Sequence, residues 1–171
     1  MSSRVLVAYA TRYGATAEVA EAIATTLRDA GLEIELRNVE DVRDVRGYDA
    51  VVFGAPVYLG RMLRAGRRFL QRHRAELARV TFAAFVVGVD REDRRRGALQ
   101  RRLAKRPPLH PVAVGVFGGL VDASRLRFRD KTPPIRKMGA LTDMRDWDAI
   151  DAWARGLAAA LARRPGSIPA A

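Results

Sequence analysis

The chain has 171 residues, of which 49% are hydrophobic, so it is long enough to bury the core of one globular domain. It contains no cysteine, which excludes disulfides, thiol catalysis and thiolate metal sites. The longest apolar run, residues 82–89, is too short to span a bilayer, and the N-terminus has no signal-peptide pattern, so we expect a cytoplasmic protein. We expect one domain over residues 1–164 and a disordered tail over residues 165–171.

The formal net charge of +12 is concentrated in the middle of the chain. Residues 61–137 hold 21 basic and 6 acidic side chains, whereas residues 1–60 hold 6 basic and 9 acidic ones. A surface of this kind attracts anionic partners. A general bias toward arginine explains the same composition without a function, and both interpretations stay open.

Apolar runs alternate with helical patterns along most of the chain. Val5–Ala8 is typical of a buried parallel strand, and the apolar residues between Val19 and Leu27 recur at helical spacing before Gly31 ends that helix. Further strands are expected at residues 33–37, 50–54, 81–89 and 112–117, and further helices at 61–78, at 92–105 and from about 146. This alternation predicts an α/β three-layer sandwich around a five-stranded parallel sheet, with the strand order 2-1-3-4-5.

Two features near the end of the chain complete this prediction. Residues 118–145 show no clean periodicity and are expected to form a long loop. Trp147 and Trp153 recur at helical spacing in the last helix and are expected in the core.

The segment from Thr11 to Thr16 joins the first strand to the first helix. It combines two threonine hydroxyls, a glycine and the backbone N–H groups of a helix start, which suits a terminal phosphate. It lacks the Gly-Lys-Ser/Thr of a P-loop and the GxGxxG of a dinucleotide site. The alternative is an ordinary strand-to-helix turn with a threonine cap.

Residues 54–62 follow the third strand and form a second candidate loop. Two glycines and a proline indicate an irregular backbone, from which Tyr58 and Met62 project. A flat ligand would find backbone hydrogen bonds and an aromatic side chain there; alternatively, Tyr58 packs on the next helix. Residues 89–91 and 118–120 follow the last two strands and would lie at the same edge of the sheet.

These segments carry a resemblance to a known family. Thr11, Tyr13, Gly14 and Thr16 match the pattern Ser/Thr-x-Thr/Tyr-Gly-x-Thr, so the first loop resembles the FMN phosphate loop of flavodoxins. Residues 118–120, 127–128, 142–143 and 146–150 resemble a subgroup of flavodoxin-domain proteins that includes the menaquinone-dependent protoporphyrinogen oxidases.

The resemblance implies a flavodoxin-like fold and FMN as the cofactor, with the phosphate in the first loop and the ring against residues 55–60 and 88–91. The predicted cofactor-binding residues are Thr11, Arg12, Tyr13, Gly14, Ala15, Thr16, Ala55, Pro56, Val57, Tyr58, Leu59, Gly60, Val89, Asp90, Gly118 and Gly119. No catalytic residue is assigned. No metal site is expected, because the two histidines lack acidic companions at ligand spacing.

The resemblance also implies an FMN-dependent oxidoreductase that oxidises protoporphyrinogen, or a similar substrate, with a quinone-linked acceptor. Residues 131–139 are shorter than the insertion that those oxidases carry at this point. An FMN electron carrier without its own substrate is one alternative, and a cofactor-free basic binding protein is another. The expected partners are a redox protein or the quinone pool, an anionic substrate and a peripheral membrane surface; nucleic acid is disfavoured, because the basic residues lack interleaved aromatics.

The basic excess is expected to surround the flavin rather than lie far from it. The arginines that follow the third, fourth and fifth strands are Arg61, Arg64, Arg91, Arg94, Arg95, Arg96, Arg125, Arg127 and Arg129. Positive charge near the ring favours its reduced, anionic form, so we expect a milder reductant than a flavodoxin with an acidic surface.

Overall fold

The computed structural model describes residues 3–58, 61–88, 101, 109–127, 136 and 140–163. Its strands are β1 (Arg4–Tyr9), β2 (Glu33–Asn38), β3 (Ala50–Tyr58), β4 (Arg61–Met62), β5 (Thr81–Gly88), β6 (Val114–Gly118), β7 (Leu120–Asp122) and β8 (Leu141–Asp143). Its helices are α1 (Ala15–Asp29), α2 (Arg64–Arg72), α3 (Arg74–Leu77) and α6 (Trp147–Ala162).

The central sheet has the order β2-β1-β3-β5-β6, and all of these strands are parallel. They are the five strands expected from the sequence, so the predicted order 2-1-3-4-5 is confirmed. The short strand β4 is an addition, because it turns back and pairs antiparallel with the end of β3.

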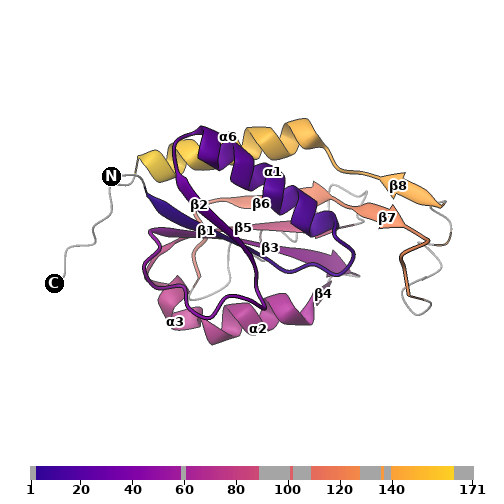
Figure 1. Ribbon diagram of the computed structural model, residues 1–171, viewed down its shortest axis with the longest axis horizontal. Helices are drawn as coiled ribbons and strands as arrows, with labels where there is room; N and C mark the ends of the chain where they lie inside the picture. Colours follow the sequence, from indigo (N-terminus) through magenta and orange to yellow (C-terminus); the bar gives the residue numbers. More distant parts are fainter. Residues whose placement is uncertain are drawn as a thin grey trace.

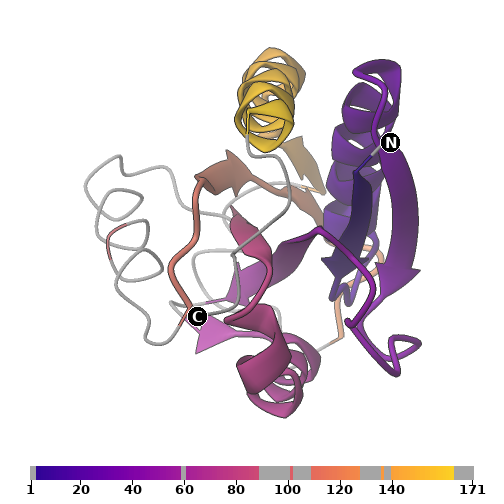
Figure 2. The same cartoon turned by 90° about the vertical axis from the view of Figure 1, so that its left-hand side faces the viewer.

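Helices cover both faces of the sheet. Helices α1 and α6 lie on one face, and α2 and α3 lie on the other (Figure 1). The same three layers are seen from the end of the sheet in Figure 2. The expected three-layer sandwich is therefore confirmed.

The alternation of side chains along β1 shows why both faces need a cover. Val5 and Val7 belong to the core under α1 and α6, whereas Leu6 and Ala8 belong to the core on the side of α2. All four are fully buried. A strand without a wet face is typical of a doubly covered parallel sheet, and each such Val or Leu side chain contributes about 1.5–3 kcal/mol by leaving water.

Local signals mark the end of α1 and the start of α6, the two long helices on the first face. Gly31 follows the end of α1 with φ +86°, the left-handed conformation that favours glycine. Asp146 precedes α6, and its side chain accepts a hydrogen bond from the amide of Ala149.

The two tryptophans of α6 lie in different surroundings. Trp153 packs on Phe85 and Phe117, whereas Trp147 is 42% exposed. The prediction that both tryptophans lie in the core is therefore wrong for Trp147.

Three predicted segments differ from the structure. The strand expected at residues 50–54 continues to Tyr58, and the helix expected at 61–78 is divided into β4, α2 and α3. The loop expected at 118–145 contains β7 and β8, which pair antiparallel to form a small second sheet. The helix expected at 92–105 and the tail at 165–171 lie outside the described segments, apart from residue 101.

Candidate functional site

The candidate site lies where the parallel strands end. The carboxyl ends of β1, β3, β5 and β6 reach the same edge of the sheet, on the side from which β7 and β8 extend (Figure 1). The amide of Ala10 donates to the carbonyl of Gly54 at 2.8 Å, so the segment after β1 starts directly beside β3. Because β1 lies between β2 and β3, the strand order reverses at this edge, which is where ligands bind in such folds.

The first predicted loop is tightly folded. The hydroxyl of Thr11 accepts a hydrogen bond from the amide of Gly14 at 3.0 Å. Gly14 has φ +94°, and a Cβ atom built there would meet no heavy atom within 4 Å. Glycine is therefore needed at this position for its backbone conformation and not for space.

This loop leaves the start of α1 without a side-chain cap. Gly14 occupies the N-cap position, and within the described part of the chain no side chain caps the first turn. The first amides of a helix have no acceptor within the helix, and they carry the positive end of its dipole. The interpretation of the loop as a turn closed by a threonine cap is therefore wrong, and Thr16 is instead buried one residue inside the helix, at 2% exposure.

The second predicted segment is a strand end rather than an irregular loop. Ala55 and Pro56 are buried within β3, and the side chain of Ala55 packs in the core next to α2. Val57 and Tyr58 are half-buried and pair with β4. The prediction of an irregular backbone from Gly54 onward is wrong up to Tyr58, and Ala55 is fully buried.

Two tyrosines bring these segments together. The rings of Tyr13 and Tyr58 meet edge to face, with their centroids 6.5 Å apart. The amide of Arg127, which follows β7, donates to the hydroxyl of Tyr13 at 3.4 Å. Tyr58 thus faces the first loop, and its neighbour is Tyr13 across the site.

The glycine pair after β6 is placed by packing. A Cβ atom on Gly118 would lie 1.9 Å from the carbonyl oxygen of Met144, so only glycine allows this contact. The amide of Met144 donates to the carbonyl of Gly119 at 3.0 Å. Both glycines are buried, and they join the end of the sheet to the segment that leaves β8.

The remaining predicted positions fall outside the described residues. These are Leu59, Gly60, Val89 and Asp90, together with the arginines at positions 91, 94, 95, 96 and 129 and the segment 131–139 except residue 136. The described arginines near this edge are exposed, and they are Arg12, Arg61, Arg64, Arg125 and Arg127. Arg125 forms an ion pair with Asp122 at 3.2 Å, and Arg12 lies 5.5 Å from the ring centre of Tyr13.

Sequence reasoning missed one residue close to this edge. Arg145 leaves β8 and reaches Glu18 in the first turn of α1, 127 positions away in the chain. Its pairing with Asp143 two residues earlier is a local signal in the sequence, but nothing in the sequence indicates the contact with Glu18. Asp143 is the last residue of β8 and pairs with this arginine through both of its carboxylate oxygens.

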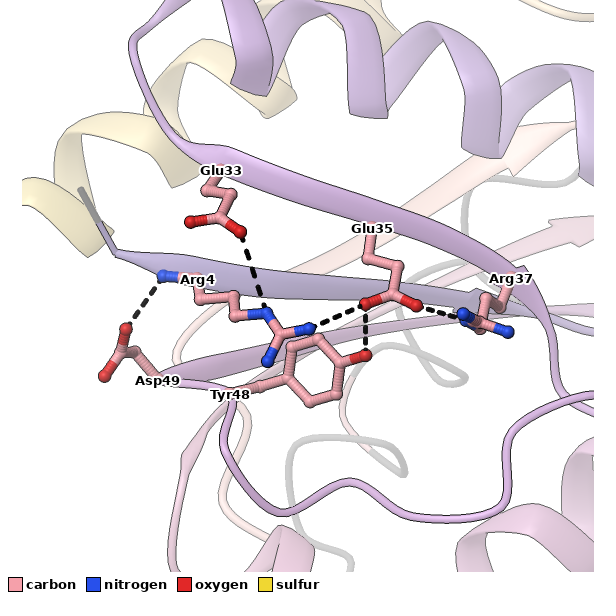
Figure 3. A network of polar contacts seen from close by, with 6 residues as sticks. All are labelled: Arg4, Glu33, Glu35, Arg37, Tyr48 and Asp49. Atoms are coloured by element: carbon pink, nitrogen blue, oxygen red, sulfur yellow. Dashed lines mark hydrogen bonds and ion pairs between the residues drawn. The ribbon is translucent and has the colours of Figure 1, made fainter.

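A polar cavity of about 590 Å³ lies elsewhere, between β2 and the chain that leads to β3. Its residues form a closed network, which Figure 3 shows from close by. Arg4 pairs with Glu33 and Glu35 and lies over the ring of Tyr48, while Arg37 also pairs with Glu35. The hydroxyl of Tyr48 donates to Glu35, and this bond is the main reason that the pKa of Glu35 is lowered.

None of the described residues of the predicted cofactor site lines this cavity. Arg4 and Arg37 both pair with Glu35 already, so the candidate functional site remains the one at the ends of the strands. Among the residues that the structure describes, no three acidic or histidine side chains are grouped to hold a metal ion. None of the helices in the described segments is long and apolar enough to cross a membrane.

Comparisons with known proteins define the class of this molecule. A model of the Flavodoxin domain matches residues 6–145, so the chain belongs to that family. Solved structures agree on the fold: Streptococcus pneumonia TIGR4 flavodoxin (TM-score 0.60, 17% identity, 92% of this chain and 99% of that one) and Flavodoxin 2 from Bacillus cereus (TM-score 0.60, 19% identity, 94% and 98%). The fold is therefore flavodoxin-like, as the sequence predicted, and membership in the family implies a flavin cofactor.

A curated relative is similar over nearly its whole length. This chain is 28% identical to the protoporphyrinogen IX dehydrogenase [quinone] of Escherichia coli (strain K12), over 91% of this chain and 94% of that protein.

Proposed function

We propose that this protein binds FMN at the carboxyl edge of its sheet and acts as a flavin-dependent oxidoreductase. The observation that carries the proposal is the meeting of an uncapped helix start with the end of β3 in a chain of the Flavodoxin domain family. FMN needs two different surroundings, one for a phosphate and one for a flat ring. Both are supported by residues at this edge.

The phosphate would bind at the start of α1. The amides of the first turn point along the helix axis toward its N-terminal end, and among the residues that the structure describes no side chain caps them. The hydroxyl of Thr11 accepts from the amide of Gly14 and still has a proton to donate to an anion. This donor set has the charge and direction that a phosphate dianion requires.

The ring would lie beside Tyr58 and the backbone of residues 55–58. These residues form the last part of β3, beyond the end of β1, and there Val57 and Tyr58 pair with the short strand β4. Gly118 and Gly119 close the site from the direction of β6. When bound, FMN supplies the redox chemistry, and the protein contributes binding, orientation and electrostatics.

The positive charge around the site would set the direction of electron flow. The exposed guanidinium groups of Arg12, Arg61 and Arg127 favour negative charge on a nearby ring and attract an anionic substrate. We therefore expect a flavin of higher potential than in an acidic flavodoxin, suited to accepting electrons.

Reconstitution with FMN tests this proposal. The purified chain, stripped of bound cofactor, is titrated with FMN, and the quenching of flavin fluorescence and the visible spectrum are followed. We expect saturation at one FMN per chain. A chain that neither quenches FMN fluorescence nor shifts its absorption bands would contradict the proposal and favour a cofactor-free basic binding protein.

A second step concerns the substrate. The similarity to protoporphyrinogen IX dehydrogenase [quinone], at matched length, favours oxidation of a porphyrinogen with a quinone acceptor. The test is to mix the FMN-loaded protein with protoporphyrinogen and menadione in the dark and to record porphyrin fluorescence. Turnover above free FMN supports an enzyme, whereas a flavin that is reduced by a reductase but ignores the porphyrinogen indicates an electron carrier.

A further inference from the structure

Arg145 is held by two carboxylates from different parts of the fold. Its Nε and one terminal nitrogen donate to the two oxygens of Asp143 at 2.8 and 2.7 Å, and its other terminal nitrogen donates to Glu18. The ring of Trp147 lies 4.7 Å from the guanidinium carbon. The side chain is only 8% exposed, and a guanidinium so far removed from water needs such partners.

Glu18 gives this arrangement its importance. Its amide donates to the carbonyl of Gly14, so Glu18 lies one turn along α1 from the helix start. At 1.5 Å per residue, that is about 6 Å along the helix axis. An ionised carboxylate there repels a phosphate bound at the helix start, unless a cation neutralises it.

The position of Arg145 is fixed from the other wall of the site. Met144, its neighbour, bonds to Gly119 through its amide and packs its carbonyl against Gly118. Arg145 therefore joins three parts of the proposed site: the end of β6, the exit of β8 and the first turn of α1.

We propose that Arg145 is a positioning residue that neutralises Glu18, so that the start of α1 accepts the phosphate of the flavin. This inference rests on the proposed function, and it concerns a residue that touches the helix and not the cofactor. If the inference holds, Arg145 affects the affinity for FMN, which carries a phosphate, and not the affinity for riboflavin, which lacks one.

The test compares the affinities of cofactor-free variants for FMN and riboflavin, measured by fluorescence quenching at low salt. We expect Arg145→Met to weaken FMN binding roughly fivefold, the effect of one unpaired carboxylate on a dianion at about 8 Å in a water-like dielectric, and to leave riboflavin binding unchanged. Combining it with Glu18→Gln removes that carboxylate and should restore FMN affinity. The matched control is Arg155→Met, which breaks an exposed pair with Asp151 on α6 and should change neither affinity.

A variant that keeps the buried arginine guards against misfolding. Glu18→Gln alone changes a half-exposed side chain and leaves Arg145 paired with Asp143, so it should bind FMN as tightly as the wild type or more tightly. Weaker FMN binding by this variant would overturn the inference. Equal losses of FMN and riboflavin affinity in Arg145→Met would also overturn the inference, and so would a double variant that does not recover FMN affinity. A wild-type chain that binds neither flavin would overturn the proposed function as well.

Discussion

Two helices that lie on the same face of the sheet begin in opposite ways. Helices α1 and α6 are joined by a hydrogen bond from the hydroxyl of Thr26 to Asp151. At the start of α6, the carboxylate of Asp146 accepts a hydrogen bond from the amide of Ala149 at 3.0 Å. At the start of α1, Gly14 has no side chain that could act as a cap, and no other side chain in the described segments takes its place.

The difference separates a structural helix start from one that is available to a ligand. Both helices bury an apolar face, and in both the first amides have no acceptor within the helix. In α6 the chain satisfies one of them with its own carboxylate. In α1 no side chain of the described residues does so, and we propose that the phosphate of FMN binds there, at the edge of the sheet where Tyr13 and Tyr58 meet. This contrast gives predictions that differ in sign between the two helices.

The largest effect is expected when a carboxylate is placed in the first loop. Thr11→Asp keeps an oxygen that accepts from the amide of Gly14, so the loop should stay folded. A negative charge beside a phosphate dianion should weaken FMN binding roughly a hundredfold. Fluorescence titration measures the change, and Thr11→Asn, which has an acceptor but no charge, is the control. If Thr11→Asp binds FMN as tightly as the wild type, the phosphate does not lie at this helix start.

The second effect compares a glycine of each helix. Gly14→Ala forces a side chain into φ +94° and should lower the free energy of unfolding by about 1–2 kcal/mol. Gly156→Ala replaces a glycine inside α6 where a Cβ atom meets nothing within 4 Å, and should raise it by about 0.8–1 kcal/mol. Urea denaturation of the cofactor-free chains measures both. The same sign for both variants would mean that backbone conformation does not distinguish the two positions.

The third effect removes the cap of α6. Asp146→Ala leaves the amide of Ala149 without its acceptor and should lower the free energy of unfolding by about 1 kcal/mol. FMN affinity should not change, because α6 has no part in the proposed phosphate site. A loss of FMN affinity without a loss of stability would place α6 in the binding machinery and remove the contrast with α1.

The sequence predicted the sheet because its strands carry strong, local signals. Val5–Ala8 is apolar on both faces, and the spacing from Val19 to Leu27 specifies the helix that covers one of them. The first loop was also predictable, since its glycine and threonines are adjacent in the chain. Its cap was not: the hydroxyl of Thr11 bonds to Gly14 within the loop, and Thr16 is buried inside the helix.

Pro56 shows why the end of β3 was misjudged. Proline lacks the amide that a strand ladder needs, so it indicated a loop. The backbone of Gly54 faces β1, since its carbonyl accepts from Ala10, and Pro56, two residues later, faces the same side. There β1 has ended, no partner requires an amide, and the carbonyl of Pro56 accepts from Leu63 instead.

Long-range pairing accounts for what else the sequence did not show. Strands β7 and β8 have three residues each and lie far apart in the chain, so neither has a measurable period. Trp147 fits the apolar spacing of α6, but it is the first residue of that helix, and its ring contacts Arg145 at the surface. Contacts made by a single side chain across the fold leave no pattern in the sequence.

The smallest effect concerns the stability of the chain in acid and the carboxylate of Asp143, the last residue of β8. The hydrogen bond from Arg145 lowers the pKa of Asp143 below its usual value of 3.8. Because the folded-state pKa is the lower one, the stabilisation is complete above pH 3.8 and is lost as the pH falls from there through the folded-state pKa. The side chain of Asp143 is 42% exposed, so solvent limits the loss to a few tenths of a kcal/mol. Urea denaturation between pH 5 and pH 2 should therefore show that the free energy of unfolding falls slightly less with acid for Asp143→Asn than for the wild type. The difference should develop between pH 3.8 and the lower pKa of the folded state. If the two limbs are parallel, the pair with Arg145 does not hold the carboxylate of Asp143 ionised, and the charge of that residue does not contribute to stability.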